Sequence, residues 1–378
     1  MNSLDLKLKN FFPDDEANKH WMDPNAGHLV EIKFEDKPPP YIIFIIFVYL
    51  KKYSFGGQWE KVNWEIPIKY KNVPMMLAHK KFGFQIKTYS DKPEAAKIAI
   101  EALRVIKKAI PTAEKLIEPI IKSQVDSGKI TISNDYYHLR SRYEYFREKA
   151  ERHLKNTKNE DFDFNSFEDH MVAYNALLKE QNKGYNYAVA MIDAYFSLLE
   201  HILVLIKPFI MVFVTESDLS KFVGQNWGEK YKTLFDISKG GSPKIHYDAI
   251  CEVKERYRNI AAHGNFQKGG GSFKVHMPHI GAIPMSLTKS KTKTHFIFST
   301  HNEFEFVSIC NVFDDFDNFL DSSSISKYGM MYIKSGLPVV FNDETKGLYS
   351  NAMKSEQDFN DFIEYMEQEF NNALNMDW

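Results

Sequence analysis

The sequence contains few of the residues that mark several common classes of protein. Among 378 residues there are two cysteines, Cys251 and Cys310, and their spacing is typical neither of metal ligands nor of a disulfide framework. This scarcity favours a reducing compartment, and we expect a cytoplasmic protein. Seven of the 48 basic residues are arginine. A position that uses arginine is therefore of interest, because lysine lacks the planar guanidinium fork.

Long hydrophobic runs and strongly basic regions are also missing. The most apolar stretch, YIIFIIFVYL from Tyr41 to Leu50, is ten residues long, too short to span a bilayer as a helix, and we interpret it as a buried strand. The polar and acidic start, MNSLDLKLKNFFPDDE, is not typical of a signal peptide. The net charge of −2 excludes a basic field over the whole molecule. We expect no membrane association, and any nucleic-acid site has to be local.

The pattern of apolar residues predicts an α+β protein that is mainly helical. β-Branched and aromatic residues between 28 and 90, interrupted by Gly and Pro, indicate a small β-sheet. Helical periodicity follows, and it is clearest at 94–110, 135–156, 185–209, 244–264 and 303–321. From this order we expect an N-terminal α+β region with a regulatory or targeting role at 1–160, a helical bundle at 165–322 and a C-terminal appendage at 323–378.

The helix expected at 185–209 has two stripes of different character. Its core stripe consists of Ala188, Ile192, Tyr195, Leu199, Ile202 and Ile206. On another face, Asp193, Ser197 and Glu200 lie at i, i+4 and i+7, which is a polar stripe in an otherwise apolar helix. Two interpretations stay open: this stripe supports a functional group nearby, or it is a solvated face.

The stretch ERYRNIAAHGNF, residues 255–266, places arginine ahead of histidine at the expected end of a helix. Arg258 and Asn259 are followed by three residues and then by His263. This order resembles the Arg-Asn-three residues-His signature of HEPN-domain ribonucleases, an all-helical family in which four to six residues separate the Arg from the His. Asp193 and Glu200, in the apolar helix ahead of it, are also similar to the family pattern. The resemblance covers about residues 165–322.

Helix geometry and the family pattern favour different arginines. At 100° per residue, Arg256, Asn259 and His263 share one flank of a helix, whereas Arg258 projects from the opposite side. The family pattern favours Arg258, and we rank it first because HEPN sites form across a dimer, where an exposed helix can present both sides to its partner. Arg256 is the second choice.

Two simpler explanations of the motif exist. An arginine and a histidine near a helix C-terminus are favourable merely because cations complement the helix dipole there. A second Arg-to-His match, from Arg147 to His153, shows that the loose pattern also arises elsewhere in this chain. That match lacks the Asn and lies in a charged, solvated part of a helix.

The resemblance implies a metal-independent endoribonuclease that needs few parts. His263 would take the proton of an RNA 2′-hydroxyl, and Arg258 would stabilise the charge that develops on the phosphate. The product would be a 2′,3′-cyclic phosphate. Asn259 would orient the ring or bind phosphate, with Glu200 and Asp193 in support. We expect no cofactor and no metal, since the spaced pair in HMPH, residues 276–279, has no acidic or cysteine partner nearby.

The expected partners follow from the same resemblance. They are an RNA substrate, a second copy of the chain that completes a composite site, and a phage-derived trigger or an antitoxin. HEPN proteins of this kind often act in bacterial defence, as abortive-infection factors or as toxins. The alternative is a catalytically inactive HEPN-like binding or sensor module. The RNA target, the trigger and the role of the N-terminal region are not readable from the sequence.

Overall fold

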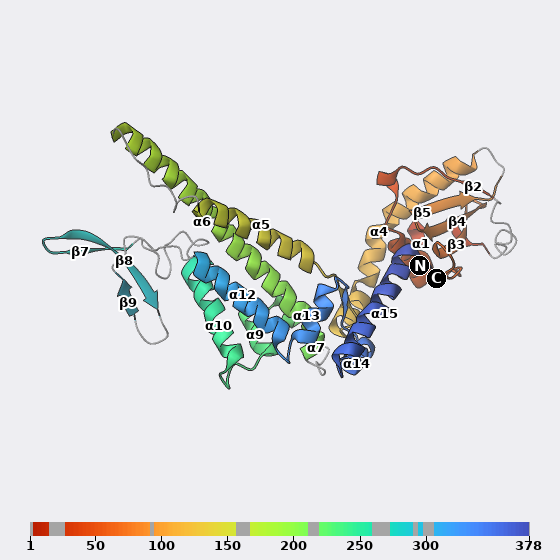
Figure 1. Cartoon of the computed structure of the whole chain (residues 1–378). Coiled ribbons are helices and arrows are strands. Elements are labelled where there is room, and N and C mark those ends of the chain that lie inside the picture. Colours follow the sequence, from red (N-terminus) through yellow and green to blue (C-terminus); the bar gives the residue numbers. More distant parts are fainter. Residues whose placement is uncertain are drawn as a thin grey trace. The chain divides into compact units, whose positions relative to one another are not determined.

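The computed structural model describes residues 3–14, 27–90, 94–155, 167–210, 219–258, 273–289, 294–297 and 306–377. Helices predominate over this part of the chain, and all of its paired strands are antiparallel. The prediction of an α+β, mainly helical class is confirmed. The chain forms two compact units, which consist of residues 1–124 with 364–378 and of residues 125–363. Figure 1 shows the elements of both.

The units differ from the expected ranges at both ends of the helical part. Helix α5 (Tyr136–Lys155), expected in the N-terminal region, belongs to the second unit because it packs along α6 (Phe167–Leu205). The chain from 323 to 363 also belongs to that unit, whereas 364–378 belongs to the first. The backbone N–H of Lys61 donates to the carbonyl oxygen of Met376 at 2.9 Å and helps to hold this terminal segment on the first unit.

The first unit contains a five-stranded sheet. Its strand order is β1-β3-β4-β5-β2. In chain order these strands are β1 (Phe11–Pro13), β2 (His28–Leu29), β3 (Val62–Tyr70), β4 (Val73–Lys80) and β5 (Gly83–Thr88). Lys71 and Asn72 join β3 to β4 with φ angles of 49° and 64°. Positive φ at both positions is the geometry of a type I′ turn, whose twist matches that of the two strands.

The apolar run at 41–50 is helical, so the prediction of a buried strand there is wrong. It forms α3 (Pro40–Phe44), which continues as the π-helix η2 (Ile45–Leu50). Its buried side chains are Ile42, Ile43, Ile46 and Phe47. This spacing repeats after one helical turn, whereas a strand buries alternate residues on one face. Pro40 sits in the first turn, where its fixed φ favours the start of a helix.

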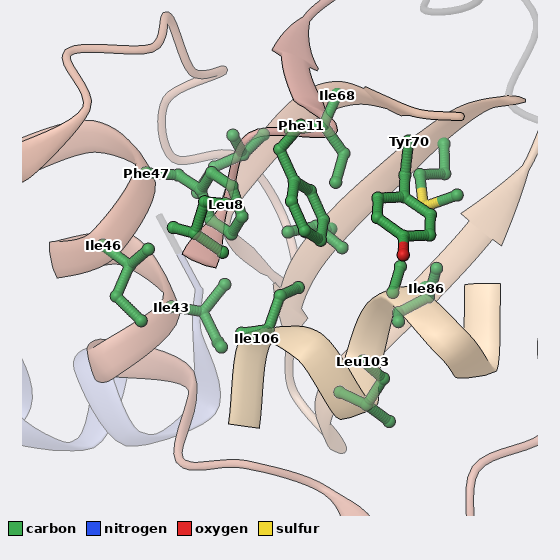
Figure 2. Packing of buried hydrophobic residues seen from close by; sticks show 14 of the residues in the cluster. Leu8, Phe11, Ile43, Ile46, Phe47, Ile68, Tyr70, Ile86, Leu103 and Ile106 are labelled. Carbon is green, nitrogen blue, oxygen red and sulfur yellow. The ribbon is translucent and has the colours of Figure 1, made fainter. Parts of the chain in front are cut away.

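Helix α4 (Ala95–Asp126) contributes to the same core. It is one continuous helix that contains two prolines. Figure 2 shows Leu103 and Ile106 of α4 together with Ile86 of the sheet and Ile46 of η2. Each of these side chains is almost fully buried, and burying one stabilises the fold by about 1.5–3 kcal/mol. The unit also contains α1 (Ser3–Lys7), η1 (Phe34–Asp36) and the end of α15 (Glu356–Asn375).

The second unit is a helical bundle centred on α6. Besides α5 and α6, its main helices are α9 (Trp227–Leu234), α10 (Ser242–Val253) with its continuation η4 (Lys254–Arg258), and α12 (Phe306–Ser322). The core stripe predicted for α6 is confirmed. Its six members, Ala188, Ile192, Tyr195, Leu199, Ile202 and Ile206, are all buried. Tyr195 stacks on Phe313 of α12 with ring centroids 3.8 Å apart.

Shorter elements complete this unit. They are β6 (Thr131–Ile132), α7 (Lys207–Ile210), α8 (Leu219–Gly224), β7 (Phe273–Met277), β8 (Gly281–Lys289), β9 (Thr294–Ile297), α13 (Lys327–Lys334), β10 (Val339–Val340), α14 (Asp343–Ala352) and the start of α15 (Glu356–Asn375). β6 pairs with β10, and β7, β8 and β9 form a sheet between η4 and α12 in the sequence. The motif expected at 258–263 therefore starts at the end of η4, on the bundle.

Candidate functional site: Arg258 on helix α6

Arg258 ends η4, and its side chain faces α6. Its Nε donates a hydrogen bond to Oδ1 of Asp193 at 3.0 Å. The guanidinium carbon lies 5.1 Å from the ring centroid of Phe196, one turn further along α6. The side chains of Arg258 and Asp193 are 33% and 54% exposed, so the ion pair lies at the surface. Within the described residues, the structure shows no hydrogen-bond acceptor for the two terminal amino groups of Arg258.

The π turn accounts for the direction of Arg258. η4 closes its hydrogen bonds between residues i and i+5, whereas an α-helix closes them between i and i+4. Side chains in and after such a turn are rotated relative to an ideal helix of 100° per residue. The sequence estimate assumed that ideal helix and directed Arg258 away from the flank of Arg256 and His263. In the structure Arg258 packs against Asp193 and Phe196 of α6. Its position relative to Arg256 and His263 stays a prediction, since the side chain of Arg256 and all of His263 lie outside the described residues.

A second cation lies beside Arg258 over a neighbouring aromatic ring. Lys254 Nζ is 5.5 Å from the ring centroid of Trp227, and Trp227 is 5.6 Å from Phe196, centroid to centroid. Both rings are buried, while Lys254 and Arg258, four residues apart, are half-buried. Sequence reasoning missed this arrangement. The available signal was Trp227 directly after Asn226, whose side chain caps the start of α9.

The polar stripe of α6 divides between two neighbours. Ser197 Oγ donates to the carbonyl oxygen of Asp193 at 2.9 Å, which satisfies the serine within the helix. Glu200, one turn further on, is half-buried and interacts electrostatically with the buried Lys230. Burial lowers the pKa of Lys230, and the charge of Glu200 opposes that shift. The structure thus brings Asp193 to Arg258 and places Glu200 at a different cation.

The rest of the predicted motif is only partly visible. Asn259 and His263 lie outside the described residues, as does the helix end expected at Gly264. Arg256 lies within η4, but its side chain is outside what the structure describes. The choice between Arg256 and Arg258 as the neighbour of His263 therefore stays a prediction.

The second Arg-to-His match, on α5, is fully engaged in packing. Arg147 binds Asp314 of α12 through both terminal nitrogens, with Nη2 to Oδ2 at 2.6 Å, and it also donates to Tyr143 Oη at 3.0 Å. The bond to Asp314 is the main reason why the pKa of Arg147 is raised. His153 Nδ1 is 2.6 Å from Glu180 Oε2, and its ring stacks on Tyr187. This pair joins helices, and the expectation of a solvated face there is wrong for both residues.

A histidine of α6 has a similar structural role. His201 Nε2 accepts a hydrogen bond from the backbone N–H of Asp135, at the start of α5, at 3.0 Å. Burial lowers the pKa of His201, while the charge of Asp135 opposes the shift. A neutral ring is required for this bond, since a protonated imidazole has no acceptor. The interpretation of His201 as structural agrees with this contact.

A polar cavity of about 560 Å³ lies between α5, α6, α12 and α13. Its charged groups pair with each other: Arg140 binds Asp317, and Lys334 Nζ is 2.7 Å from Asp321. Tyr195 Oη donates to Asp317 at 2.9 Å from the core side. Because these charges already have partners, the cavity offers a ligand less than Arg258 does.

No group of three or more metal-ligating side chains occurs within the described ranges. His276 and His279, the pair in HMPH, are both exposed. One described helix, Glu168–Leu205, is long and apolar enough to cross a membrane, but 61% of its most apolar window is buried inside the bundle. Such burial is typical of the core helix of a soluble protein.

The chemistry that this site permits is the binding of an anion. A guanidinium that is 33% exposed, and whose terminal amino groups have no acceptor among the described residues, matches the geometry of a phosphate group. Lys254, beside it, would add a second positive charge, whereas Asp193 reduces the local net charge and fixes Nε. No protein-family model, curated protein or solved structure matches the chain.

Proposed function

We propose that the helical unit is a metal-independent endoribonuclease of the HEPN type. The observation that carries this proposal is the placement of Arg258. It lies one residue ahead of Asn259 and five ahead of His263, and a carboxylate of the preceding helix, Asp193, fixes its guanidinium at Nε. In the part of the chain that the structure describes, no side chain or backbone oxygen occupies its terminal amino groups, which can bind a phosphate. The sequence resemblance assigns these same residues to the site.

The reaction requires a base, an anion-binding group and the substrate's own nucleophile. His263 takes the proton from an RNA 2′-hydroxyl, and the 2′-oxygen attacks the adjacent phosphorus. The bond from phosphorus to the 5′-oxygen breaks, and that oxygen takes up a proton as it leaves. The products are a 2′,3′-cyclic phosphate and a 5′-hydroxyl. Arg258 stabilises the added charge on the phosphoryl oxygens, and Asn259 orients the imidazole. DNA is spared because it lacks the 2′-hydroxyl.

The proposal includes a homodimer in which two copies of the motif face each other and form a composite site. In that arrangement the arginine and the histidine of one reaction centre can come from different chains. Arg256 is the second candidate for the arginine, because on an ideal helix it shares one flank with His263 of the same chain.

The biological setting belongs to the proposal as well. A cytoplasmic RNase without cofactors fits a bacterial defence or toxin effector, of the abortive-infection kind, that is held inactive until a trigger or the loss of an antitoxin releases it. The first unit, with its five-stranded sheet, would serve in regulation or targeting. The resemblance to HEPN proteins supports this setting.

A non-catalytic HEPN-like binding or sensor module is the second candidate function. The observation that favours it is also the ion pair of Arg258 and Asp193, because a carboxylate on the guanidinium competes with a phosphate. In this alternative the surface of Lys254 and Arg258 binds RNA or another phosphorylated ligand without cleaving it.

One experiment separates the two functions. Purified protein is incubated with total RNA in EDTA, and the new ends are mapped. Cleavage with cyclic-phosphate ends that is lost in His263→Ala supports the nuclease. Binding of RNA without any cleavage supports the second candidate, the binding module. Unchanged cleavage by His263→Ala would reject the assigned site. In cells, the nuclease proposal expects that the same substitution removes growth inhibition.

A further inference from the structure

The N-terminal part of α6 extends beyond the helix that packs on it. At 1.5 Å per residue, the 39 residues of α6 span about 58 Å, and the 20 residues of α5 span about 30 Å. Figure 1 shows α6 continuing past the C-terminal end of α5. We call residues 168–182 the arm.

The contacts of α5 end part-way along the arm. A Cβ at Gly184 would lie 2.7 Å from Leu154, which shows how closely the two helices approach there. Four residues nearer the start of α6, His153 of α5 binds Glu180. Beyond that point, four large apolar side chains of the arm are exposed to solvent, whereas Ala173 and Leu177 are half-buried.

These side chains form a stripe. Met171, Tyr174 and Leu178 lie at i, i+3 and i+7, and they are 43%, 56% and 37% exposed. Val172, beside them, is 71% exposed. A spacing of three and four residues directs side chains along one face of a helix, as the a and d positions of a coiled coil do.

The stripe of the arm continues the buried seam of the bundle in the same heptad register. Alternating steps of three and four lead from Met171, Tyr174 and Leu178 through Gln181 and Tyr185 to the core stripe that starts at Ala188. In the bundle this seam is buried by other helices of the chain. In the arm the same seam is apolar but exposed, which is typical of a surface that pairs with another helix.

We infer that the arms of two copies of this chain pair antiparallel to each other. In an antiparallel coiled coil the a positions face d positions, so Tyr174 lies opposite Leu178 of the partner subunit. Met171 then lies opposite Gln181 of the partner subunit. The relation is symmetric about a two-fold axis near residue 176, so one stripe supplies both halves of the interface.

The charges of the arm select this direction. Glu168 and Asp169 make its first turn acidic. Lys179 lies in its second half, and Lys183, which pairs with Glu180 at 2.6 Å, directly follows the arm. Antiparallel pairing sets the acidic turn near Lys183 of the partner subunit. Parallel pairing would place two acidic turns side by side, which is unfavourable.

The inference rests on the stripe and its charges. With the two-fold axis near residue 176, the two copies of Asp193, which holds Arg258, lie about 51 Å apart along the paired helices. The arm interface is therefore a different contact from the composite site of the proposed nuclease, and the two are tested separately.

The first test is the mass of the full chain in solution, measured by sedimentation or light scattering over a range of concentrations. We expect a dimer in equilibrium with the monomer. Leu178→Glu puts a charge into the seam of each copy and is expected to raise the dissociation constant at least about tenfold. Ile245→Glu is the matched control, since Ile245 is an exposed apolar residue on α10 of the same unit. It should leave the constant unchanged.

Three results of this test would overturn the inference. They are a monomer at every concentration, a dimer that Leu178→Glu does not weaken, and equal weakening by the control. Circular dichroism shows whether Leu178→Glu is folded. RNA cleavage is read separately: a dimer lost in Leu178→Glu without any nuclease activity in the native chain supports the arm and rejects the proposed function.

The second test fixes direction without disturbing the seam by a charge. It uses Met171→Cys and Gln181→Cys in a Cys251→Ser background, where the remaining Cys310 is buried. In antiparallel arms these positions face each other, so a disulfide forms when the two variants are mixed but in neither alone. In parallel arms each variant links to its own copy, and the mixed pair is about 15 Å apart along the helix, beyond the reach of a disulfide. Self-linking or no linking would overturn the antiparallel pairing.

Discussion

The chain carries two Arg-to-His matches, and their surroundings differ. On α5, Arg147 is bound through both terminal nitrogens to Asp314, and His153 is held by Glu180. At the end of η4, Arg258 has one carboxylate contact, through Nε, and its terminal amino groups are open within the described residues. The sequence spacing is similar in the two cases. The two arginines differ in how many of their guanidinium N–H groups already donate to other side chains of the fold.

This comparison gives a physical criterion for the candidate site. If a guanidinium that joins two helices by a bidentate pair turns to a ligand, the fold loses the stabilisation that the pair contributes. If a surface guanidinium with a single hydrogen bond turns to a ligand, the fold loses much less, because an exposed ion pair contributes about 0–1 kcal/mol to stability. Arg258 therefore suits function, and Arg147 suits structure.

The largest effect is expected for cleavage of RNA by histidine variants. His263→Ala should lower the rate by about 10²–10⁴-fold, because a general base contributes a factor of this size. His153→Ala is the matched control on the other motif, and it should retain cleavage in proportion to the folded fraction. The measurement is the initial rate on a defined RNA in EDTA. A rate that follows His153 and not His263 would reverse the assignment of the two motifs.

Substitution of the two arginines should lower the stability of the helical unit by different amounts. Arg147→Ala leaves Asp314 and Tyr143 without their partner and should lower the free energy of unfolding of the helical unit by about 1–3 kcal/mol. Arg258→Ala removes a surface pair and should cost less than about 1 kcal/mol. Chemical denaturation measures both.

RNA cleavage by the Arg258 variants tests the functional side of the same comparison. Arg258→Ala should lose cleavage while it stays folded, and Arg258→Lys should restore little of it, because lysine lacks the bidentate fork. A folded Arg258→Ala protein with native activity would move the assignment to Arg256 or reject the site.

Much of the helical unit could be predicted from sequence, because its periodicity is long and regular. The core stripe of α6 was predicted residue by residue, and all of it is buried. The short apolar run at 41–50 was not predictable in the same way. Ten apolar residues fit a buried strand and a buried helix equally, and only the packing of Ile42, Ile43, Ile46 and Phe47 decides between them.

The candidate site shows the same limit. The sequence places Asp193 and Arg258 on two different helices, and the family pattern connects them. The direction of Arg258, however, depends on the π turn of η4, which spacing alone does not reveal. Phe196 and Trp227 lie beneath Arg258 and Lys254 because α6 packs against α9. This is a tertiary contact, so no local sequence pattern predicts it.

A smaller effect should follow from the carboxylate that holds Arg258. Asp193→Ala frees Nε and should reduce the cleavage rate about tenfold, as expected when a group is less well positioned. Asp193→Asn keeps an acceptor and should reduce it less. Glu200→Gln is the control on the same stripe, because Glu200 interacts with Lys230. An increase in cleavage with Asp193→Ala would show that the carboxylate competes with the phosphate for Arg258, and it would contradict the positioning role.

The smallest expected effect is on the pH dependence of stability, through His201, which binds the start of α5. The pKa of His201 is lowered in the folded chain by burial, so between that value and the unfolded value of about 6.5 the unfolded chain binds more protons. Stability should therefore rise with pH through this window and fall as the pH drops below about 6.5, with a slope of at most about 1.4 kcal/mol per pH unit for one histidine. His201→Gln keeps an acceptor for the N–H of Asp135 but does not titrate. It should reduce the slope without removing it, because burial lowers the pKa of His246 as well. Unfolding curves between pH 5 and 7 measure this, and an unchanged slope in His201→Gln would show that His201 does not contribute.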